Sequence, residues 1–204
     1  MNRMTNYLAN YFAIPALAFL LAGAVQAAEK PATPGTSPAA RYLQAATGNS
    51  LNFTFTQLGA DSTGQFRKFT TELVYDDKNL AASSLEVKID IVSLDTQDAE
   101  RDEALKGADL FDSKTHPTAT YVARTLARNS SGGLEAIGQL TLRGVKKDLH
   151  LPLALKTTTD GLELSGHSSI KRLDYGVGQG EWQSTESVGD EVKIQYKVTL
   201  VRAK

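Results

Sequence analysis

Histidine and cysteine, the side chains that most often bind transition metals in proteins, are scarce in this chain of 204 residues. Cysteine is absent, and the three histidines, His116, His150 and His167, are not closely spaced. Zinc sites draw on four such ligands, usually with pairs only a few residues apart. His150 and His167 also fall on strand faces that the surrounding alternation of apolar residues marks as outward. The sequence therefore predicts no metal site.

A cluster of charged residues between positions 95 and 103 is the other group that could do chemistry, because two carboxylates can act as a general acid and base. The cluster comprises Asp95, Asp98, Glu100, Arg101, Asp102 and Glu103. Acidic residues are favoured in the first turn of a helix, and we interpret the cluster in that way. Arg101 is a candidate for a buried strut that pairs with Asp95 or Asp109. No nucleophile elbow, phosphate loop or dinucleotide fingerprint is found, so we do not expect an enzyme.

The elements that would position these residues are strands, because apolar and polar side chains alternate repeatedly from Arg41 onward. Leu149, Leu151, Leu153 and Leu155 form one such run, and successive side chains of a strand point to opposite faces. The runs cover residues 51–58, 64–75, 85–91, 118–129, 134–142, 148–156, 161–172 and 191–202. The one helical stretch is 98–106, with Asp95 and Thr96 as candidate caps. This pattern predicts an all-β antiparallel fold, either a sandwich or an up-and-down barrel of eight or more strands.

Three of the predicted strands place small residues in the middle of the face that should be buried. These residues are Ala123, Gly138, Gly166 and Ser168. A close-packed interior leaves no void, so either bulky side chains or a ligand must fill the space. Phe53, Phe55, Phe69 and Trp182 could fill it from across the interior, whereas an eight-stranded barrel is wide enough to hold one small ligand. Composition leaves both alternatives open.

The N-terminal residues have the pattern of a secretory signal peptide. Arg3 is the only charge in residues 1–27, an apolar run follows at 12–25, and small residues precede the expected cleavage between Ala27 and Ala28. An uncleaved anchor is the alternative, but a membrane span needs about 20 apolar residues. We therefore expect export to the periplasm. Residues 28–40, rich in proline and alanine, predict a flexible linker before a single domain at 41–203.

The charge of the exported chain argues against polyanionic partners. Cleavage would remove only Arg3 from the 22 basic residues, so that 21 basic and 23 acidic residues remain. Charges of both signs are scattered along the chain. Such a surface has no footprint for nucleic acid or an anionic membrane. Without cysteine, the domain must be stable through its core alone.

Several ordered blocks of sequence carry a resemblance to a known family. They are Phe53–Gly59, Gly64–Phe66, Val87–Thr96, Leu105–Asp112, His116–Tyr121, Gly138–Lys146 and Ile170–Gly176. In these blocks the chain resembles the YceI family, described as polyisoprenoid-binding proteins with a lipocalin-like barrel. The resemblance covers about residues 41–203. It implies a tunnel that holds an extended isoprenoid tail, with the polar head near the mouth, and no other cofactor.

One departure from the family pattern bears on the ligand. Many members have His before Leu-Gly, where this chain has Gln57. Gln57, together with the segment Gly178–Trp182, resembles the branch sometimes fused to cytochrome b-type membrane domains. That resemblance implies a quinone-like isoprenoid, and transient contact with a membrane or a membrane cytochrome.

Strand faces and resemblance together predict which residues line the cavity. They are Phe53, Phe55, Phe69, Leu105, Phe111, Tyr121, Ala123, Gly138, Leu140, Gly166, Ser168 and Trp182. The helix and the segment after it, up to Phe111, are expected to close one end of the barrel and border the entrance. The alternative is a solid barrel that acts as a protein-interaction module, with Trp182 and Tyr175 as a contact patch. No feature of the sequence specifies an oligomeric state.

Overall fold

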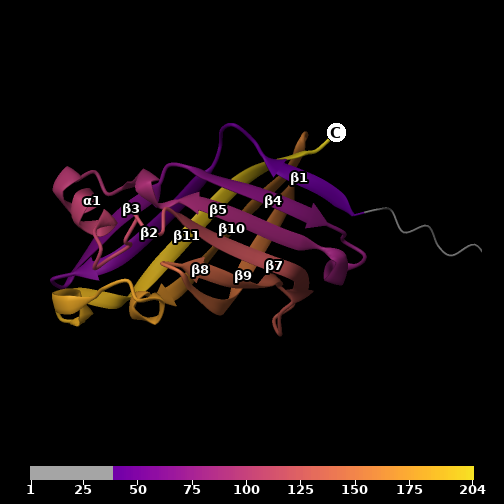
Figure 1. Cartoon of the computed structure of the whole chain (residues 1–204). Helices are drawn as coiled ribbons and strands as arrows, with labels where there is room; N and C mark the ends of the chain where they lie inside the picture. The colour runs from indigo at the N-terminus through magenta and orange to yellow at the C-terminus, as the bar shows by residue number, and fades with distance from the viewer. Residues whose placement is uncertain (1–38) are drawn as a thin grey trace, which may run out of the picture. The chain divides into compact units, whose positions relative to one another are not determined.

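The computed structural model describes residues 39–204, which form an antiparallel β-barrel with one α-helix (Figure 1). The strands are β1 (Ala40–Gln44), β2 (Ser50–Gln57), β3 (Ala60–Phe66), β4 (Phe69–Tyr75), β5 (Ser84–Asp90), β6 (Leu94–Asp95), β7 (Thr118–Arg128), β8 (Leu134–Leu142), β9 (Val145–Thr157), β10 (Gly161–Lys171) and β11 (Val188–Arg202). Helix α1 spans Ala99–Lys106, and short 3₁₀ turns are η1 (Leu80–Ala82), η2 (Ile91–Ser93), η3 (Arg172–Tyr175) and η4 (Gly180–Gln183). The expected signal peptide, its cleavage site and nearly all of the expected linker lie outside the described residues.

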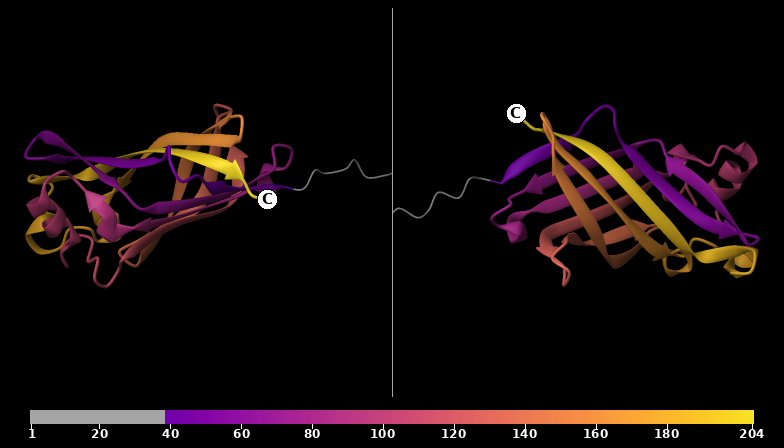
Figure 2. Two further views of the ribbon diagram at one scale, coloured as in Figure 1. Left: turned by 90° about the horizontal axis from the view of Figure 1, so that it is seen from above. Right: turned by 180° about the vertical axis from the view of Figure 1, so that it is seen from behind.

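Eight strands close the barrel in the order β1-β4-β5-β7-β8-β9-β10-β11, because β1 pairs with both β4 and β11. The long strand β11 makes this closure possible: its last residues pair with β1, and its earlier part pairs with β2. The prediction of a barrel is thereby confirmed over the sandwich. In Figures 1 and 2, α1 and the η3–η4 segment lie at one end of the barrel, and β1 and the C-terminus lie at the other.

The end of the barrel remote from α1 is filled by close-packed side chains. Leu73, Leu126, Ala136 and Leu200 are at most 2% exposed. Each fully buried leucine contributes about 1.5–3 kcal/mol of hydrophobic stabilisation relative to an exposed one. This end is therefore solid core, and any internal space must lie toward α1.

The expected strand boundaries need three corrections. Residues 64–75 form two strands, β3 and β4, separated at Arg67 and Lys68, and β3 begins earlier, at Ala60, directly after a turn in which Leu58 and Gly59 have positive φ. Strand β1 begins at Ala40, inside the expected linker. Alternation could not be detected in these two strands, because β3 begins with polar residues and β1 is short. Both strands form by pairing with neighbours, β1 with β4 and β3 with β2.

A bulge in β7 changes which face of that strand is buried. The register with β8 shifts between Ala123 and Thr125. An extra residue in one strand reverses the inward and outward faces beyond it. Leu126 is therefore buried beyond the bulge, whereas alternation continued from Tyr121 and Ala123 would place Thr125 and Ala127 on the buried face.

Candidate ligand-binding cavity

Two apolar cavities follow one another inside the barrel. The outer one, about 140 Å³, lies between β2, α1 and η4, and the inner one, about 80 Å³, lies deeper toward the packed end. Four side chains border both cavities: Leu51, Ile89, Leu140 and Ile194. The interior is thus a nearly continuous apolar space from the α1 end to the middle of the barrel.

Aromatic side chains form much of the wall of the outer cavity. The Phe53 ring packs against Phe55 and Phe66, with centroids 6.2 and 5.2 Å away. Phe66 in turn contacts Phe111 edge to face at 6.1 Å, which ties β3 to the segment after α1. Trp182 of η4 completes this side. Offset and edge-to-face pairs of this kind stabilise the packing beyond the area that they bury.

Arg172 holds the loop that carries Trp182 to the cavity. Its side chain is only 4% exposed and donates hydrogen bonds of 2.7–3.2 Å to backbone carbonyl oxygens. The acceptors are Val177, Trp182, Ser184, Val188 and Gly189. Burial lowers the pKa of Arg172, and the charge of Asp190 opposes that shift. Arginine is suited to this position because its rigid, planar guanidinium offers five N–H donors.

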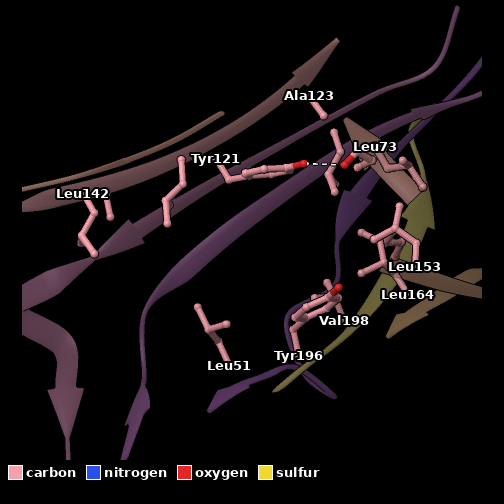
Figure 3. Close-up of a cluster of buried hydrophobic side chains, with 14 of the residues drawn as sticks. Leu51, Leu73, Tyr121, Ala123, Leu142, Leu153, Leu164, Tyr196 and Val198 are labelled. Carbon is pink, nitrogen blue, oxygen red and sulfur yellow. Dashed lines mark hydrogen bonds between the residues drawn. The ribbon is translucent and has the colours of Figure 1, made fainter. Parts of the chain in front are cut away.

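The glycines on the inner wall are covered by tyrosine rings. A Cβ at Gly138 would come within 2.7 Å of Cζ of Tyr121, and one at Gly166 within 2.6 Å of Cζ of Tyr196. The hydroxyl of Tyr121 donates to the carbonyl oxygens of Ala136 (2.9 Å) and Leu149 (3.1 Å). Figure 3 draws one hydrogen bond of this hydroxyl as a dashed line. Desolvation by burial raises the pKa of both phenols, which therefore stay protonated to a higher pH than an exposed tyrosine does.

The structure places the predicted lining residues in three groups. Phe53, Phe55, Leu105, Phe111, Leu140 and Trp182 border the outer cavity; Phe69, Tyr121 and Leu140 border the inner one; Ala123, Gly138, Gly166 and Ser168 border neither. The expected position of this last group on the cavity wall is corrected. Ala123 packs in the solid core, and the two glycines lie beneath tyrosine rings. The space was filled by neighbouring strands of the same wall, not from across the barrel.

Several cavity residues were missing from the prediction. Leu51, Ile89, Ile91, Val188 and Ile194 all border the outer cavity. A signal was present for four of them, since Leu51 continues the alternation of Phe53 and Phe55, and Ile89, Ile91 and Ile194 lie on alternating runs. Val188 had no such signal, because its strand is irregular between Val188 and Val192.

The charged cluster around α1 is structural. Asp98 is the N-cap and accepts hydrogen bonds from the amides of Glu100 and Arg101, so the expected caps Asp95 and Thr96 are wrong. Arg101 is half-buried beside the outer cavity and pairs with Asp98 at 3.3 Å, not with Asp95 or Asp109. Asp95 instead binds Gln65 and Arg67, and these hydrogen bonds lower its pKa.

Along residues 39–204, no helix is both long enough and apolar enough to cross a membrane. Nor does that part of the chain bring three or more histidine or acidic side chains together as a group that could hold a metal ion.

Comparison with known proteins places the chain in a family. The YceI-like domain matches residues 42–200. The chain belongs to the YceI family. A UPF0312 protein of Vibrio cholerae is 38% identical to it over 135 residues, which cover 63% of this chain and 71% of that relative.

Solved structures share the barrel of this YceI-family chain. BcnA of Burkholderia cenocepacia superposes with a TM-score of 0.70 at 29% identity, covering 74% of this chain and 94% of BcnA. A polyisoprenoid binding domain from Saccharophagus degradans gives a TM-score of 0.63 at 17% identity, covering 81% and 99%. At that identity the second likeness concerns the fold alone.

Asn52 and Gln57 of β2 and Arg101 of α1, all half-buried, are the polar residues of the YceI-family chain nearest the α1 end of the outer cavity. Successive side chains of a strand point to opposite faces, so Gln57 shares the inward face of Phe53 and Phe55, whereas Asn52 lies on the other face and also borders a polar surface pocket beside Gln65. The wall of the cavity itself is almost entirely apolar.

Proposed function

We propose that this protein binds a long isoprenoid lipid, of polyprenyl or quinone type, inside the barrel and carries or stores it without chemical change. The observation that carries this proposal is the nearly continuous apolar interior formed by the outer and inner cavities. Large apolar spaces in a folded protein are costly unless something fills them, because their lining atoms lose packing partners. The polyisoprenoid binding domain of Saccharophagus degradans, which shares the fold, supports the choice of lipid.

The tail and the head of such a lipid have different places in the cavity. The tail lies along the aromatic wall and the shared residues Leu51 and Leu140, deep in the barrel. The polar head lies at the α1 end, where Gln57 and Arg101 border the cavity. A head group with a carbonyl oxygen, as in a quinone, can accept a hydrogen bond from an amide or guanidinium N–H.

The cavity volume indicates that the walls move when a long tail binds. An apolar cavity of about 150 Å³ is large enough for benzene, so the outer cavity fits a group of only about six carbons. A tail of several isoprene units needs more space than the two cavities together provide. The barrel must therefore widen as the lipid enters.

Energetics favour a role in carriage. Each buried CH₂ contributes about 0.8 kcal/mol, so a tail of several isoprene units would nominally exceed the limit of about 20 kcal/mol on real affinities. The state that competes with the barrel is the membrane, not water. A protein that matches the bilayer in affinity can take up lipid and return it. Export to the periplasm, expected from residues 1–27, would place this exchange between membranes, where a membrane cytochrome is a candidate partner.

Native mass spectrometry of protein purified from its host after gentle lysis tests the proposal. We expect a co-purifying apolar mass that organic extraction identifies as an isoprenoid. A Leu140→Trp variant is the matched control, because its indole would occupy the space between the two cavities and displace the lipid. Wild-type protein of clean apo mass would contradict the proposal and favour the solid interaction module.

A further inference from the structure

The wall of the barrel is split between β9 and β10. Their ladder covers only Leu162–Ser165 of β10, paired with Thr157–Ala154 of β9. Among the strand pairings of the described chain, none joins residues 145–153 of β9 to residues 166–171 of β10. Each of these segments instead pairs only on its far side, with β8 and β11 respectively. Two strand edges therefore face one another across a window in the wall.

Local sequence explains why the ladder stops at this point. The next residues of β9 include Pro152, which has no N–H to donate to β10. Its carbonyl oxygen instead accepts a hydrogen bond from the hydroxyl of Tyr196, whose ring lies over Gly166. The side chain of Tyr196 thus closes the end of the window next to Pro152, where no backbone hydrogen bond joins the two strands.

An ion pair closes the other end. Lys147 of β9 and Asp174 of η3 lie 3.1 Å apart, with half-exposed side chains. A surface groove of about 500 Å³ lies over the part of the window next to this ion pair, with Lys171 and Glu191 also on its border. The groove is polar at its rim, but its floor contains Leu149 and Ile170.

These two floor residues separate the groove from the interior. Leu149 borders both the groove and the inner cavity, and Ile170 borders both the groove and the outer cavity. Both side chains are only half-buried. Rotation of these two apolar side chains, with a small separation of the strands, would join the groove to both cavities.

We propose that this window is a lateral gate through which the isoprenoid tail passes between the barrel interior and a membrane. The proposal rests on the proposed function, because it assigns a route to the same lipid. The window is the place where the wall can widen with little loss, since no backbone pair crosses it. Separating β8 from β9, or β10 from β11, would instead break long ladders of hydrogen bonds. The α1 end is held together by the hydrogen bonds that Arg172 donates to the loop around Trp182. The packed rings of Phe53, Phe55, Phe66 and Phe111 also hold this end.

A reversible cross-link across the window tests the gate. The chain contains no cysteine, so a Lys147→Cys/Asp174→Cys variant can be joined specifically by a short bis-methanethiosulfonate reagent. The protein is first loaded with geranylgeraniol that carries an anthraniloyl fluorophore, and transfer to phosphatidylcholine vesicles is then followed by fluorescence. We expect the link to slow transfer about tenfold or more, which corresponds to about 1.4 kcal/mol. Reductant should restore the original rate.

Glu163→Cys/Lys197→Cys is the matched control. These residues form an ion pair at 3.0 Å on strands that are already paired, so the same link should leave transfer unchanged. Equal transfer with and without the link across the window, with binding retained, would overturn the gate and assign the route to the α1 end. Failure of wild-type protein to bind the fluorophore would instead reject the proposed function itself.

Single substitutions keep the gate testable if the double variant does not fold. Lys147→Ala removes the ion pair at one end of the window and should speed transfer by at most about fivefold, since a surface ion pair is weak. Lys197→Ala removes the control ion pair and should have no effect. Equal rates for the two variants and wild type would count against the gate.

Discussion

At the scale of single residues, the inner wall of the barrel depends on pairs of glycine and tyrosine on neighbouring strands. Gly138 has Tyr121 over it, and Gly166 has Tyr196. In both pairs the absent side chain leaves room for a ring whose hydroxyl reaches a backbone carbonyl. The glycines therefore serve the packing of the wall and do not enlarge the cavity.

Gly138→Ala tests this interpretation. The new Cβ would meet the carbonyl oxygen of Val122 at 2.6 Å as well as the Tyr121 ring, so we expect the free energy of unfolding to fall by about 1–3 kcal/mol. Urea denaturation measures the change. Gly189→Ala is the control, because its nearest neighbour would be Thr56 Cβ at an ordinary 3.4 Å. Equal effects at both positions would show that the ring does not limit the space.

The same tyrosines predict a loss of stability in alkali. A tyrosine in the unfolded chain has a pKa of about 10, and burial raises the pKa of Tyr121 and Tyr196 in the folded protein. Above that pH the folded state holds more protons than the unfolded state. Stability is therefore complete below about pH 10 and falls by about 1.4 kcal/mol per pH unit for each such tyrosine.

Denaturation curves at a series of alkaline pH values measure this slope. Tyr196→Phe should remove the contribution of one tyrosine, about 1.4 kcal/mol per pH unit, from this slope. At neutral pH the free energy of unfolding should fall by about 1 kcal/mol, because the hydrogen bond to the carbonyl oxygen of Pro152 is lost. Tyr42→Phe is the control, since Tyr42 lies on β1 outside both cavities. An unchanged slope in the Tyr196 variant would contradict the assignment.

At the scale of elements, α1 and the segment after it cover one end of the cavity. Phe111 borders the outer cavity, and its backbone N–H donates to the carbonyl oxygen of Leu105 at 3.0 Å. The edge-to-face contact with Phe66 fixes the ring against β3. The segment is therefore held by side-chain packing that a single truncation can loosen.

Phe111→Ala should speed the release of bound lipid, because it removes apolar surface of the outer cavity that would hold the lipid. Transfer of the fluorescent geranylgeraniol to vesicles measures the rate. Leu126→Ala is the control: it lies in the solid end of the barrel and should cost about 2–5 kcal/mol of stability without changing the release rate. Large destabilisation by Phe111→Ala at an unchanged rate would mark the residue as plain core.

At the scale of the whole molecule, the role of a lipid carrier depends on where the barrel is delivered. We expect the mature protein to begin at Ala28 and to be found in the periplasmic fraction. Intact mass spectrometry of fractionated cells measures the N-terminus directly. Ala27→Arg is a suitable control, since a bulky charge before the cleavage site should block processing. A retained Met1 in protein from the membrane pellet would contradict the prediction.

Much of the fold could be predicted from the sequence because its signals are local. Alternation of side chains identifies β8, β9, β10 and β11, since each strand records its own buried face. The acidic start of α1 is likewise visible without any neighbour. Half of the predicted lining residues border the outer cavity. Phe53 was predicted from alternation along its strand, and Phe111 from the apolar residues that follow the helix.

Tertiary structure alone decided the features that depend on a neighbouring strand. The bulge beside Ala123 reverses a face that alternation had assigned, and the space at Gly138 belongs to a ring that the sequence places 17 positions away. The window likewise arises because β9 and β10 stop pairing beyond Ala154 and Ser165, next to Pro152, while each strand continues beside another one. Alternation of apolar and polar residues predicts which face of a strand is buried, but it does not predict which atoms occupy the space on that face. Only the pairing and register of the closed barrel determine that.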